Sequence, residues 1–276
     1  MEEKLCVIAG SGTLPRKIAD HFDSSGDRIF FLAFENVTDP KVVVGRQTQW
    51  FKLGQVQKAI DAMHKHNVTK VVMAGPIRRP ALSSLNLDSR AMKMLVQGGL
   101  KVSGDDGLLS LVAEEIEKEG MKVIGIEEVL SESLTQVGLL AGPNLNKIAW
   151  NDIDRGLKVL NQLGPCDVGQ SVAIQEGLVL AVEAIEGTDQ MIERAGSLKR
   201  DVSGPILIKM SKPNQDKRID LPTAGSNTIK NAIKAGFRGL ALEANKSLLL
   251  DKERVLEIAE KNSFFVLGLD QSKLPL

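Results

Sequence analysis

The sequence predicts an α/β protein with two domains, on three observations. Short apolar runs alternate with segments of helical periodicity through the first half of the chain; the second half continues the alternation but adds a pair of strands spaced as a hairpin; and regular periodicity lapses after Ser131. Parallel strands need crossover connections, which helices supply. We therefore expect a parallel sheet with helices on both faces over residues 1–131, and a mixed α/β domain over residues 132–276.

The N-terminal half begins with two apolar runs, "KLCVIAG" and "RIFFLAF", that are typical of short buried strands. Between them the apolar residues of Leu14–Asp23 recur at helical spacing, which predicts a strand, helix, strand unit. The same signals predict a helix near Gln55–His66, a strand from Lys70, a helix over about Asp106–Lys118 and a strand from Lys122.

The segment after Ser131, "SESLTQVGLLAGPNLNK", contains glycine and proline with little periodicity, which predicts an irregular connection. Beyond it, "SVAIQEGLVLAVEA" consists of two apolar runs split by Glu176 and Gly177, which is the pattern of a hairpin. The remaining expected elements are a helix over Asp152–Leu163, strands at "GPILIKM", "GLALEA" and "FFVLGL", and helices over Asn227–Ala235 and Lys252–Lys261.

Charge balance and the start of the chain narrow the classes of function. Lys plus Arg and Asp plus Glu number 35 each, so no net field attracts nucleic acid, and we expect no nucleic-acid partner. The two cysteines form neither a disulfide framework nor a metal cluster. The N-terminus lacks the features of a signal peptide, and no run approaches the ~20 apolar residues that span a bilayer, so we expect a cytoplasmic protein.

The motif "GSGTLP" follows the first expected strand and precedes the first helix, where a dinucleotide fingerprint would lie. Gly10 and Gly12 permit a tight turn and the close approach of a phosphate to the helix N-terminus, with Thr13 and Leu14 beside it. Pro15 stands at the third glycine position and suits the first turn of a helix. Nicotinamide binding, contact with a phosphate or ribose, and a plain tight turn are three open interpretations.

Two further motifs follow strands or open helices in the N-terminal half. In "AGPIRRP", Gly75 ends a strand, and Arg78 and Arg79 either clamp a pyrophosphate bidentately or form a solvated basic loop. In "GDDG", one of Asp105 and Asp106 is expected to cap the following helix. The second acid is available to bind a metal ion or a sugar hydroxyl.

The segment "CDVGQSVAIQEGLVLAVEAIEGTDQMIERAG" surrounds the expected hairpin with acidic residues. Glu183 ends the second strand, and an acid at the end of a core strand requires a cation, a metal ion or water nearby. Thr188 is expected to cap the next helix and to leave free N–H groups that face a phosphate. Local structure alone does not require three acids, Glu183, Glu186 and Asp189, within seven residues.

The segment "KPNQDKRIDLPTAG" follows another buried strand. The residues before Pro213 and Pro222 are excluded from helical geometry, so an extended and restricted loop is expected. Asp216 and Asp220 suit Mg²⁺, which takes one or two carboxylates and completes its coordination with water and phosphate. The cations expected to neutralise a diphosphate are Lys209, Lys212, Lys217 and Arg218.

Taken together, these motifs resemble those of the LpxI family. "IAGSGTLP", "VVMAGPIRRP", "GDDGLL", the acidic hairpin segment and "KPNQDKRIDLPTAG" occur in this order over nearly the whole chain. The resemblance implies an N-terminal Rossmann-like domain, a distinct C-terminal catalytic domain and a ligand between the two. It also implies hydrolysis of the pyrophosphate of UDP-2,3-diacylglucosamine, with Mg²⁺, to UMP and 2,3-diacylglucosamine 1-phosphate (lipid X) in lipid A biosynthesis.

The resemblance also implies roles for individual residues. Asp220 is the implied catalytic or metal-binding carboxylate, and Asp216 and Asp189 are further implied catalytic acids. The implied metal ligands are Asp220, Asp189 and Glu186. The implied substrate-binding residues are Gly10, Gly12, Thr13, Leu14, Gly75, Arg78, Arg79, Gln170, Thr188, Arg194, Lys212, Gln215, Arg218 and Thr223.

The two acyl chains of such a substrate need an apolar path, because each methylene left in water costs about 0.8 kcal/mol. We expect "VGLLAGPNL" and "MKMLV" to line that path or to rest on the inner face of the inner membrane, which makes the protein a peripheral one. A homodimer is also expected, because such dimers are common. The alternatives are an NAD-dependent dehydrogenase and a non-catalytic nucleotide-sugar-binding protein.

Overall fold

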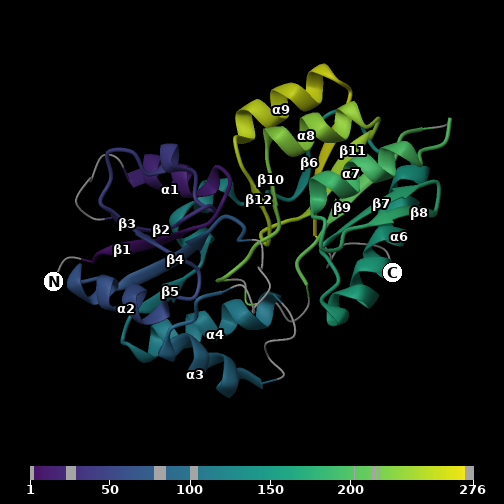
Figure 1. Ribbon diagram of the computed structural model, residues 1–276. Helices are drawn as coiled ribbons and strands as arrows, with labels where there is room; N and C mark the ends of the chain where they lie inside the picture. The colour runs from purple at the N-terminus through teal and green to yellow at the C-terminus, as the bar shows by residue number, and fades with distance from the viewer. Residues whose placement is uncertain are drawn as a thin grey trace. The chain divides into compact units, whose positions relative to one another are not determined.

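The computed structural model describes residues 3–22, 29–77, 85–99, 105–201, 203–212, 216 and 218–270. The chain forms two compact units (Figure 1). The N-terminal unit comprises Met1–Ser131 together with Asp216–Asp220, and the C-terminal unit comprises Glu132–Gln215 together with Leu221–Leu276. One short segment of the C-terminal half therefore belongs to the N-terminal unit.

The N-terminal unit is built on a parallel sheet in the strand order β3-β2-β1-β4-β5. Each pair of neighbouring strands is parallel, which confirms the predicted parallel sheet. The strand order reverses direction between β1 and β4, and ligands of open α/β sheets bind at the carboxyl ends of the strands at such a point. The strands are β1 (Leu5–Ala9), β2 (Ile29–Phe34), β3 (Thr48–Phe51), β4 (Lys70–Ala74) and β5 (Lys122–Ile124).

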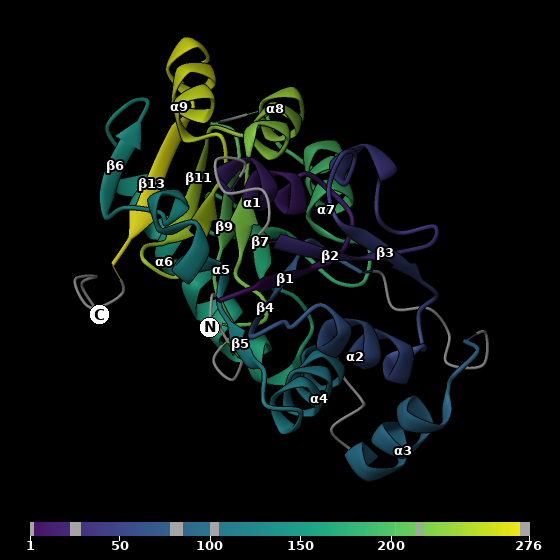
Figure 2. The same cartoon turned by 90° about the vertical axis from the view of Figure 1, so that its left-hand side faces the viewer.

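Helices cover both faces of this sheet, as predicted: Figures 1 and 2 show α1 on one face and α2 and α4 on the other. Strand β3 and helix α3 were not predicted from the sequence. The N-terminus of α3 is capped by Asp88, whose side chain accepts a hydrogen bond of 2.9 Å from the backbone N–H of Ala91. The helices are α1 (Leu14–Phe22), α2 (Val56–Lys65), α3 (Ser89–Gly98), α4 (Asp105–Lys118), α5 (Ile126–Val129) and the 3₁₀ turn η2 (Pro40–Val42).

The C-terminal unit contains a six-stranded mixed sheet in the order β6-β13-β11-β9-β7-β8. Strands β13, β11 and β9 are parallel, while β6 and β7 run antiparallel to their neighbours. A separate pair, β10 and β12, is parallel. The strands are β6 (Gly138–Ala141), β7 (Ser171–Gln175), β8 (Leu178–Val182), β9 (Ile206–Lys209), β10 (Thr223–Ala224), β11 (Gly239–Glu243), β12 (Leu248–Leu249) and β13 (Phe265–Leu269).

The predicted hairpin is confirmed as β7 and β8. Glu176 and Gly177 at its turn both have positive φ, of 48° and 77°, the backbone of a type I′ turn. The predicted irregular connection after Ser131 is wrong in part, because it contains the edge strand β6. The strand was not predicted because it is bordered by glycines, which are typical of loops. Gly138 and Gly142 have φ of 105° and 82°, which glycine adopts without strain.

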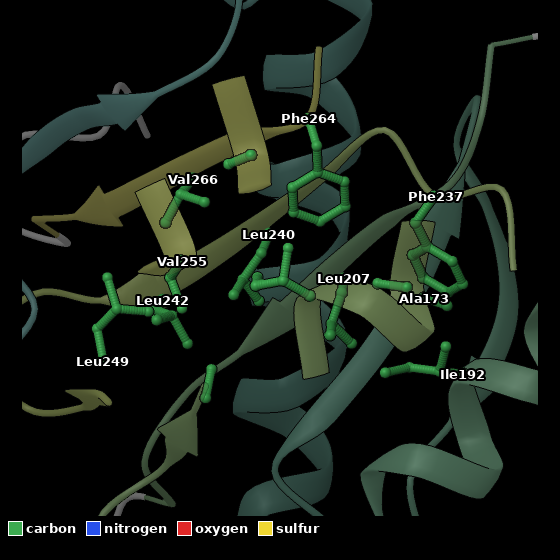
Figure 3. Packing of buried hydrophobic residues seen from close by; sticks show 14 of the residues in the cluster. Ala173, Ile192, Leu207, Phe237, Leu240, Leu242, Leu249, Val255, Phe264 and Val266 are labelled. Carbon is green, nitrogen blue, oxygen red and sulfur yellow. The ribbon is translucent and has the colours of Figure 1, made fainter. Parts of the chain in front are cut away.

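The helices of the C-terminal unit separate onto the two faces of its sheet. Helix α6 packs on one face through Ile153 and Leu157, and α7, α8 and α9 pack on the other, where Leu207 and Leu240 lie in their core (Figure 3). Helix α6 begins five residues earlier than predicted, because Asn146 caps it. The helices are α6 (Lys147–Leu163), α7 (Thr188–Ser197), α8 (Ser226–Lys234), α9 (Lys252–Lys261) and the 3₁₀ turns η5 (Ser131–Ser133) and η6 (Gly164–Cys166). Across the described residues, no helix combines the length and apolar character needed to cross a bilayer.

Candidate functional site

Charged side chains are buried at one edge of the C-terminal sheet. Strands β8, β9 and β11 point the same way, so their carboxyl ends share that edge. Glu183 follows β8, Lys209 ends β9 and Glu243 ends β11, and their exposed fractions are 8%, 4% and 3%. Charged residues are almost never this buried unless they are paired. Three of the four buried charged residues among those described therefore lie at this edge; the fourth, Asp152, forms an ion pair with Arg238.

Glu183 and Lys209 are linked through the hydroxyl of Thr188. Thr188 Oγ1 donates to Glu183 Oε1 at 2.7 Å and accepts from Lys209 Nζ at 2.7 Å, while Lys209 Nζ lies 3.9 Å from Glu183 Oε2. Burial acts to raise the pKa of Glu183, but the ammonium of Lys209 and hydrogen bonds outweigh it, so the net pKa is lowered. Glu183 is therefore an ionised buried acid, and Lys209 is the neighbouring cation that was one of the partners predicted for it.

The predicted capping role of Thr188 is wrong. Gly187, with φ of 83°, is the N-cap of α7, and Thr188 is the first helical residue. The reason is local chemistry, because the hydroxyl of Thr188 is bound between a carboxylate and an ammonium instead of the helix N–H groups. The first N–H groups of α7 lie beside this bonded trio, at the positive end of the helix dipole.

The expected metal ligands near α7 have protein partners. Glu186 forms an ion pair with Arg194, which lowers the pKa of Glu186, and Arg194 also donates to the backbone oxygen of Val182 at 2.8 Å. Asp189 is exposed and accepts from Asn231 Nδ2 at 3.1 Å. In the described ranges, no three His, Cys, Asp or Glu side chains are grouped as metal ligands. Metal binding at this edge would thus require substrate phosphate and water to complete the coordination.

Two further predicted residues, Lys212 and Gln170, lie at the same edge of the C-terminal sheet. Lys212 forms an ion pair with Asp167, which follows η6 with φ of 54°. The backbone oxygen of Gln170 accepts from Met210 N at 2.9 Å. Gly169 packs so closely that a Cβ atom would lie 2.0 Å from the backbone oxygen of Glu183. The segments around residues 167–170, 183–189 and 209–212 therefore meet.

Three buried oxygen atoms at this edge lack a well-formed hydrogen bond among the described residues: Oε1 of Gln170, Oγ of Ser171 and Oε2 of Glu183. Ser171 still interacts with the Glu183 carboxylate, because its hydroxyl helps to lower the pKa of Glu183. Buried polar atoms are normally satisfied, by protein, water or a ligand. Together with the buried ammonium of Lys209, these atoms form a polar site suited to water and to an oxygen-rich ligand.

Glu243 is a residue of this edge that was not predicted from the sequence. Its Oε2 accepts from the backbone N–H of Ser211 at 3.1 Å and from the Ser211 hydroxyl, and its Oε1 accepts from Lys246 Nζ at 2.6 Å. Glu243 thereby fixes the residue that precedes Lys212. The available signal was an acid at the end of the apolar strand "GLALEA".

In the N-terminal unit, the glycine motif joins the loops that follow β1 and β4. Gly10 N donates to Ala74 O at 2.7 Å, and Ser11 N donates to Pro76 O at 2.9 Å. A Cβ atom on Gly10 would lie 2.2 Å from Gly75 O, and one on Gly75 would lie 2.2 Å from Ser11 O. These two glycines are therefore required by the contact between two backbone segments.

The neighbours of this contact differ in what they offer a ligand. Gly12 has φ of 82°, and no described atom lies within 4 Å of an added Cβ, so backbone conformation alone explains its glycine. Thr13 is exposed. Leu14 is buried and can meet a ligand only through its backbone at the start of α1. Arg78, Arg79 and Gln215 lie outside the described residues, as do Lys217 and the side chains of Asp105 and Asp106.

The segment Asp216–Asp220 forms a bonded turn in the N-terminal unit. Arg218 donates from Nε to Asp216 Oδ1 at 3.1 Å and from Nη2 to Asp216 Oδ2 at 2.7 Å. The hydrogen bonds from Arg218 lower the pKa of Asp216. A carboxylate with a lowered pKa is a weak proton acceptor, so this geometry favours a positioning role for Asp216 over that of a general base.

Asp220 ends this turn and is half-buried. Its N–H donates to Asp216 O at 3.4 Å. Thr223, three residues later, belongs to the C-terminal unit, where its hydroxyl donates to Leu221 O at 2.9 Å. The motif "KPNQDKRIDLPTAG" is thus divided: its first and last residues belong to the C-terminal unit, and its acidic centre belongs to the N-terminal one.

Comparison with known proteins gives matches along both halves of the chain. The family model described as the LpxI N-terminal domain matches residues 4–133, and the one described as the LpxI C-terminal domain matches residues 136–267. A protein of Caulobacter vibrioides named UDP-2,3-diacylglucosamine pyrophosphatase LpxI is 36% identical over an alignment of 281 positions, which covers 99% of each chain. With matches across both domains and a relative of this similarity, the chain belongs to the LpxI family.

Proposed function

We propose that this chain is a hydrolase that cleaves the pyrophosphate bond of UDP-2,3-diacylglucosamine, releasing UMP and 2,3-diacylglucosamine 1-phosphate in lipid A biosynthesis. The observation that carries the proposal is the similarity over 99% of the chain to a protein named as the UDP-2,3-diacylglucosamine pyrophosphatase. The buried charges at the edge of the C-terminal sheet support it, because such groups cluster where a site must bind or transform a charged ligand.

Each unit offers groups that suit part of this substrate. In the C-terminal unit, Lys209, Lys212 and Arg194 supply the positive charge that a diphosphate requires. In the N-terminal unit, the start of α1 offers backbone N–H groups beside Gly12, at the strand ends where nucleotides bind in open α/β sheets. The expectation that one substrate lies between the two domains stays a prediction.

In the proposed reaction, a water oxygen forms a bond to one phosphorus atom while the bridging P–O bond breaks. Asp220 orients this water and accepts its proton, a contribution typically worth 10²–10⁴-fold in rate. The departing phosphate leaves with the bridging oxygen and its negative charge, and Lys209, Lys212 and Arg194 are the cations proposed to stabilise it. Mg²⁺, when bound by Asp220 and the phosphate oxygens, would supply further charge neutralisation.

The alternative of an NAD-dependent dehydrogenase is less well supported. Gly10 and Gly75 are explained by the contact between their two loops, and Pro15 replaces the third glycine of the dinucleotide motif. A non-catalytic nucleotide-sugar-binding protein would use the same cations, and Asp220→Ala separates the two alternatives. In a hydrolase, wild type turns over the substrate and this variant binds it without turnover. In a binding protein, wild type and variant both bind the substrate without turnover.

We also propose that the protein rests on the cytoplasmic surface of the inner membrane through helix α3. Met92 and Val96, four residues apart, have exposed fractions of 52% and 75%, and Lys93 beside them is also exposed. A lipid surface suits this combination, since apolar residues insert and a cation faces anionic headgroups. The diacylated substrate is the reason to expect such a surface. The proposed homodimer stays a prediction.

Flotation with anionic phospholipid vesicles tests the membrane proposal. The Met92→Ser/Val96→Ser variant should lose most vesicle binding, whereas Val44→Ser, which alters an equally exposed valine elsewhere in the N-terminal unit, should not. Equal binding by all three proteins, or binding by none, would contradict the assignment of α3.

The proposed reaction is tested by incubating the purified chain with UDP-2,3-diacylglucosamine and measuring UMP. We expect one UMP per 2,3-diacylglucosamine 1-phosphate, with loss of activity on chelation and recovery with Mg²⁺. Activity that persists in chelator would remove the metal from the proposal and leave the hydrolase. No UMP release under any condition would refute the hydrolase itself.

A further inference from the structure

The turn Asp216–Asp220 is the part of the N-terminal unit that comes from the C-terminal half of the sequence. It carries Asp220, the carboxylate proposed above to act on water. A catalytic carboxylate must be placed accurately, since a misplacement of about 1 Å can cost as much as 10²-fold in rate. What holds this turn to the N-terminal unit therefore matters for the proposed reaction.

One attachment is apolar. Ile219 has an exposed fraction of 7% and belongs to the same buried cluster as Ile116 of α4 and Val123 of β5. Its neighbours Arg218 and Asp220 are only half-buried, so Ile219 is the residue of the turn that enters the core. This anchor sets the depth of the turn but leaves its rotation about the isoleucine side chain open.

The second attachment is a chain of charged groups. Arg218 Nη1 donates to Glu117 Oε1 at 2.7 Å, while Nε and Nη2 of the same guanidinium bind the two oxygens of Asp216. Arg218 N also donates to Asp216 Oδ1 at 3.0 Å, and Ile219 N donates to Asp216 O at 2.9 Å. The guanidinium thus connects α4 to a turn that is already closed on itself, and it supplies the orientation that the isoleucine does not.

We propose that Glu117 is a positioning residue for Asp220, holding Arg218 and, through Arg218, the turn that ends in the reactive carboxylate. The inference rests on the proposed hydrolase function. Stability alone does not account for the contact. The Glu117 and Arg218 side chains are 36% and 42% exposed, and an ion pair this exposed adds little to the folded state.

The test compares the variants Glu117→Gln and Glu117→Asp with a matched control, Glu257→Gln. Glu257 forms an exposed ion pair of 2.5 Å with Lys261 on α9, so the control removes an equivalent pair at a place with no proposed role. We expect Glu117→Gln to lower kcat roughly tenfold with KM within about twofold and an unchanged unfolding temperature. Glu117→Asp, which keeps the carboxylate, should recover most of the loss, and Glu257→Gln should match wild type.

Hydrogen exchange supplies a readout that does not depend on turnover. Glu117→Gln should speed exchange at the amides of Ile219 and Asp220, because their turn loses its tie to α4, while Glu257→Gln should leave them unchanged. Wild-type kcat and wild-type exchange in Glu117→Gln would overturn the inference. A fall in kcat accompanied by an equal loss of thermal stability in both Glu117 variants would also overturn it, as a purely structural effect. If the wild-type chain releases no UMP, the proposed function fails, and the exchange data alone decide whether Glu117 holds the turn.

Discussion

The two units differ in what their sheets bury. Ten polar or charged residues among those described are buried, and nine of them belong to the C-terminal unit, with Thr38 the exception. The N-terminal unit instead shows two backbone loops in contact through Gly10 and Gly75. The C-terminal unit therefore supplies charged side chains, and the N-terminal unit supplies backbone amides and receives its carboxylate, Asp220, from the other half of the sequence. The groups proposed to take part in the reaction are therefore spread over both halves of the sequence.

The largest expected effect is on the buried charges of the C-terminal unit. Lys209→Met removes the ammonium that faces Glu183 and leaves a buried carboxylate unpaired. We expect the free energy of unfolding to fall by about 3–5 kcal/mol, measured by urea denaturation. Adding Glu183→Gln should recover part of this loss, because the unpaired charge is gone. An unaltered unfolding curve for Lys209→Met would show that the pair is not what stabilises this edge.

The second prediction concerns the backbone contact between Gly75 and the loop of Gly10 in the N-terminal unit. Gly75→Ala places a Cβ atom 2.2 Å from Ser11 O at a residue with φ of 84°. We expect a loss of about 3 kcal/mol in stability from the clash and the strained backbone. Gly12→Ala is the matched control, since its φ is also positive but its Cβ meets no described atom; it should cost about 1 kcal/mol. Equal losses for both would remove the packing explanation of Gly75.

The divided motif can be tested at two apolar residues that lie two positions apart. Ile219→Ala should destabilise the N-terminal unit and Leu221→Ala the C-terminal unit, since each is buried in a different unit. Each deletion of buried methyl groups should cost about 2 kcal/mol. Hydrogen exchange of the strands reports which sheet loses protection. Loss of protection in the same sheet for both variants would contradict the assignment of the turn to the N-terminal unit.

The smallest expected effect concerns surface charges of the N-terminal unit. Hydrogen bonds from Arg90 and His64 lower the pKa of Glu119, so this acid stabilises the fold above its ordinary pKa of 4.5 and loses that contribution as pH falls through its lowered value. Arg90→Met should cost about 1 kcal/mol at pH 7 and make stability less dependent on pH between 5 and 3. Unfolding measured at several pH values checks this, and an equal slope in both proteins would refute it.

Much of the fold was predictable, because β1, β2 and β4 are apolar runs buried on both faces. Strand β3 was missed because it is a short edge strand with exposed Gln49 and Trp50. Of the site, the acids and cations were predicted from their places at strand ends. The attachment of residues 216–220 was not predictable, since a single isoleucine in "DKRIDLP" has no periodicity and its partners lie about a hundred residues earlier in the sequence.

The central claim is that this chain hydrolyses UDP-2,3-diacylglucosamine with the carboxylate of Asp220. The most direct measurement is UMP release by wild type and by Asp220→Asn, with substrate binding measured on both proteins. The account predicts turnover by wild type, a loss of at least about 10²-fold in Asp220→Asn, and retained binding. Wild-type turnover in Asp220→Asn would contradict the role of Asp220, and no turnover by wild type would contradict the proposed reaction.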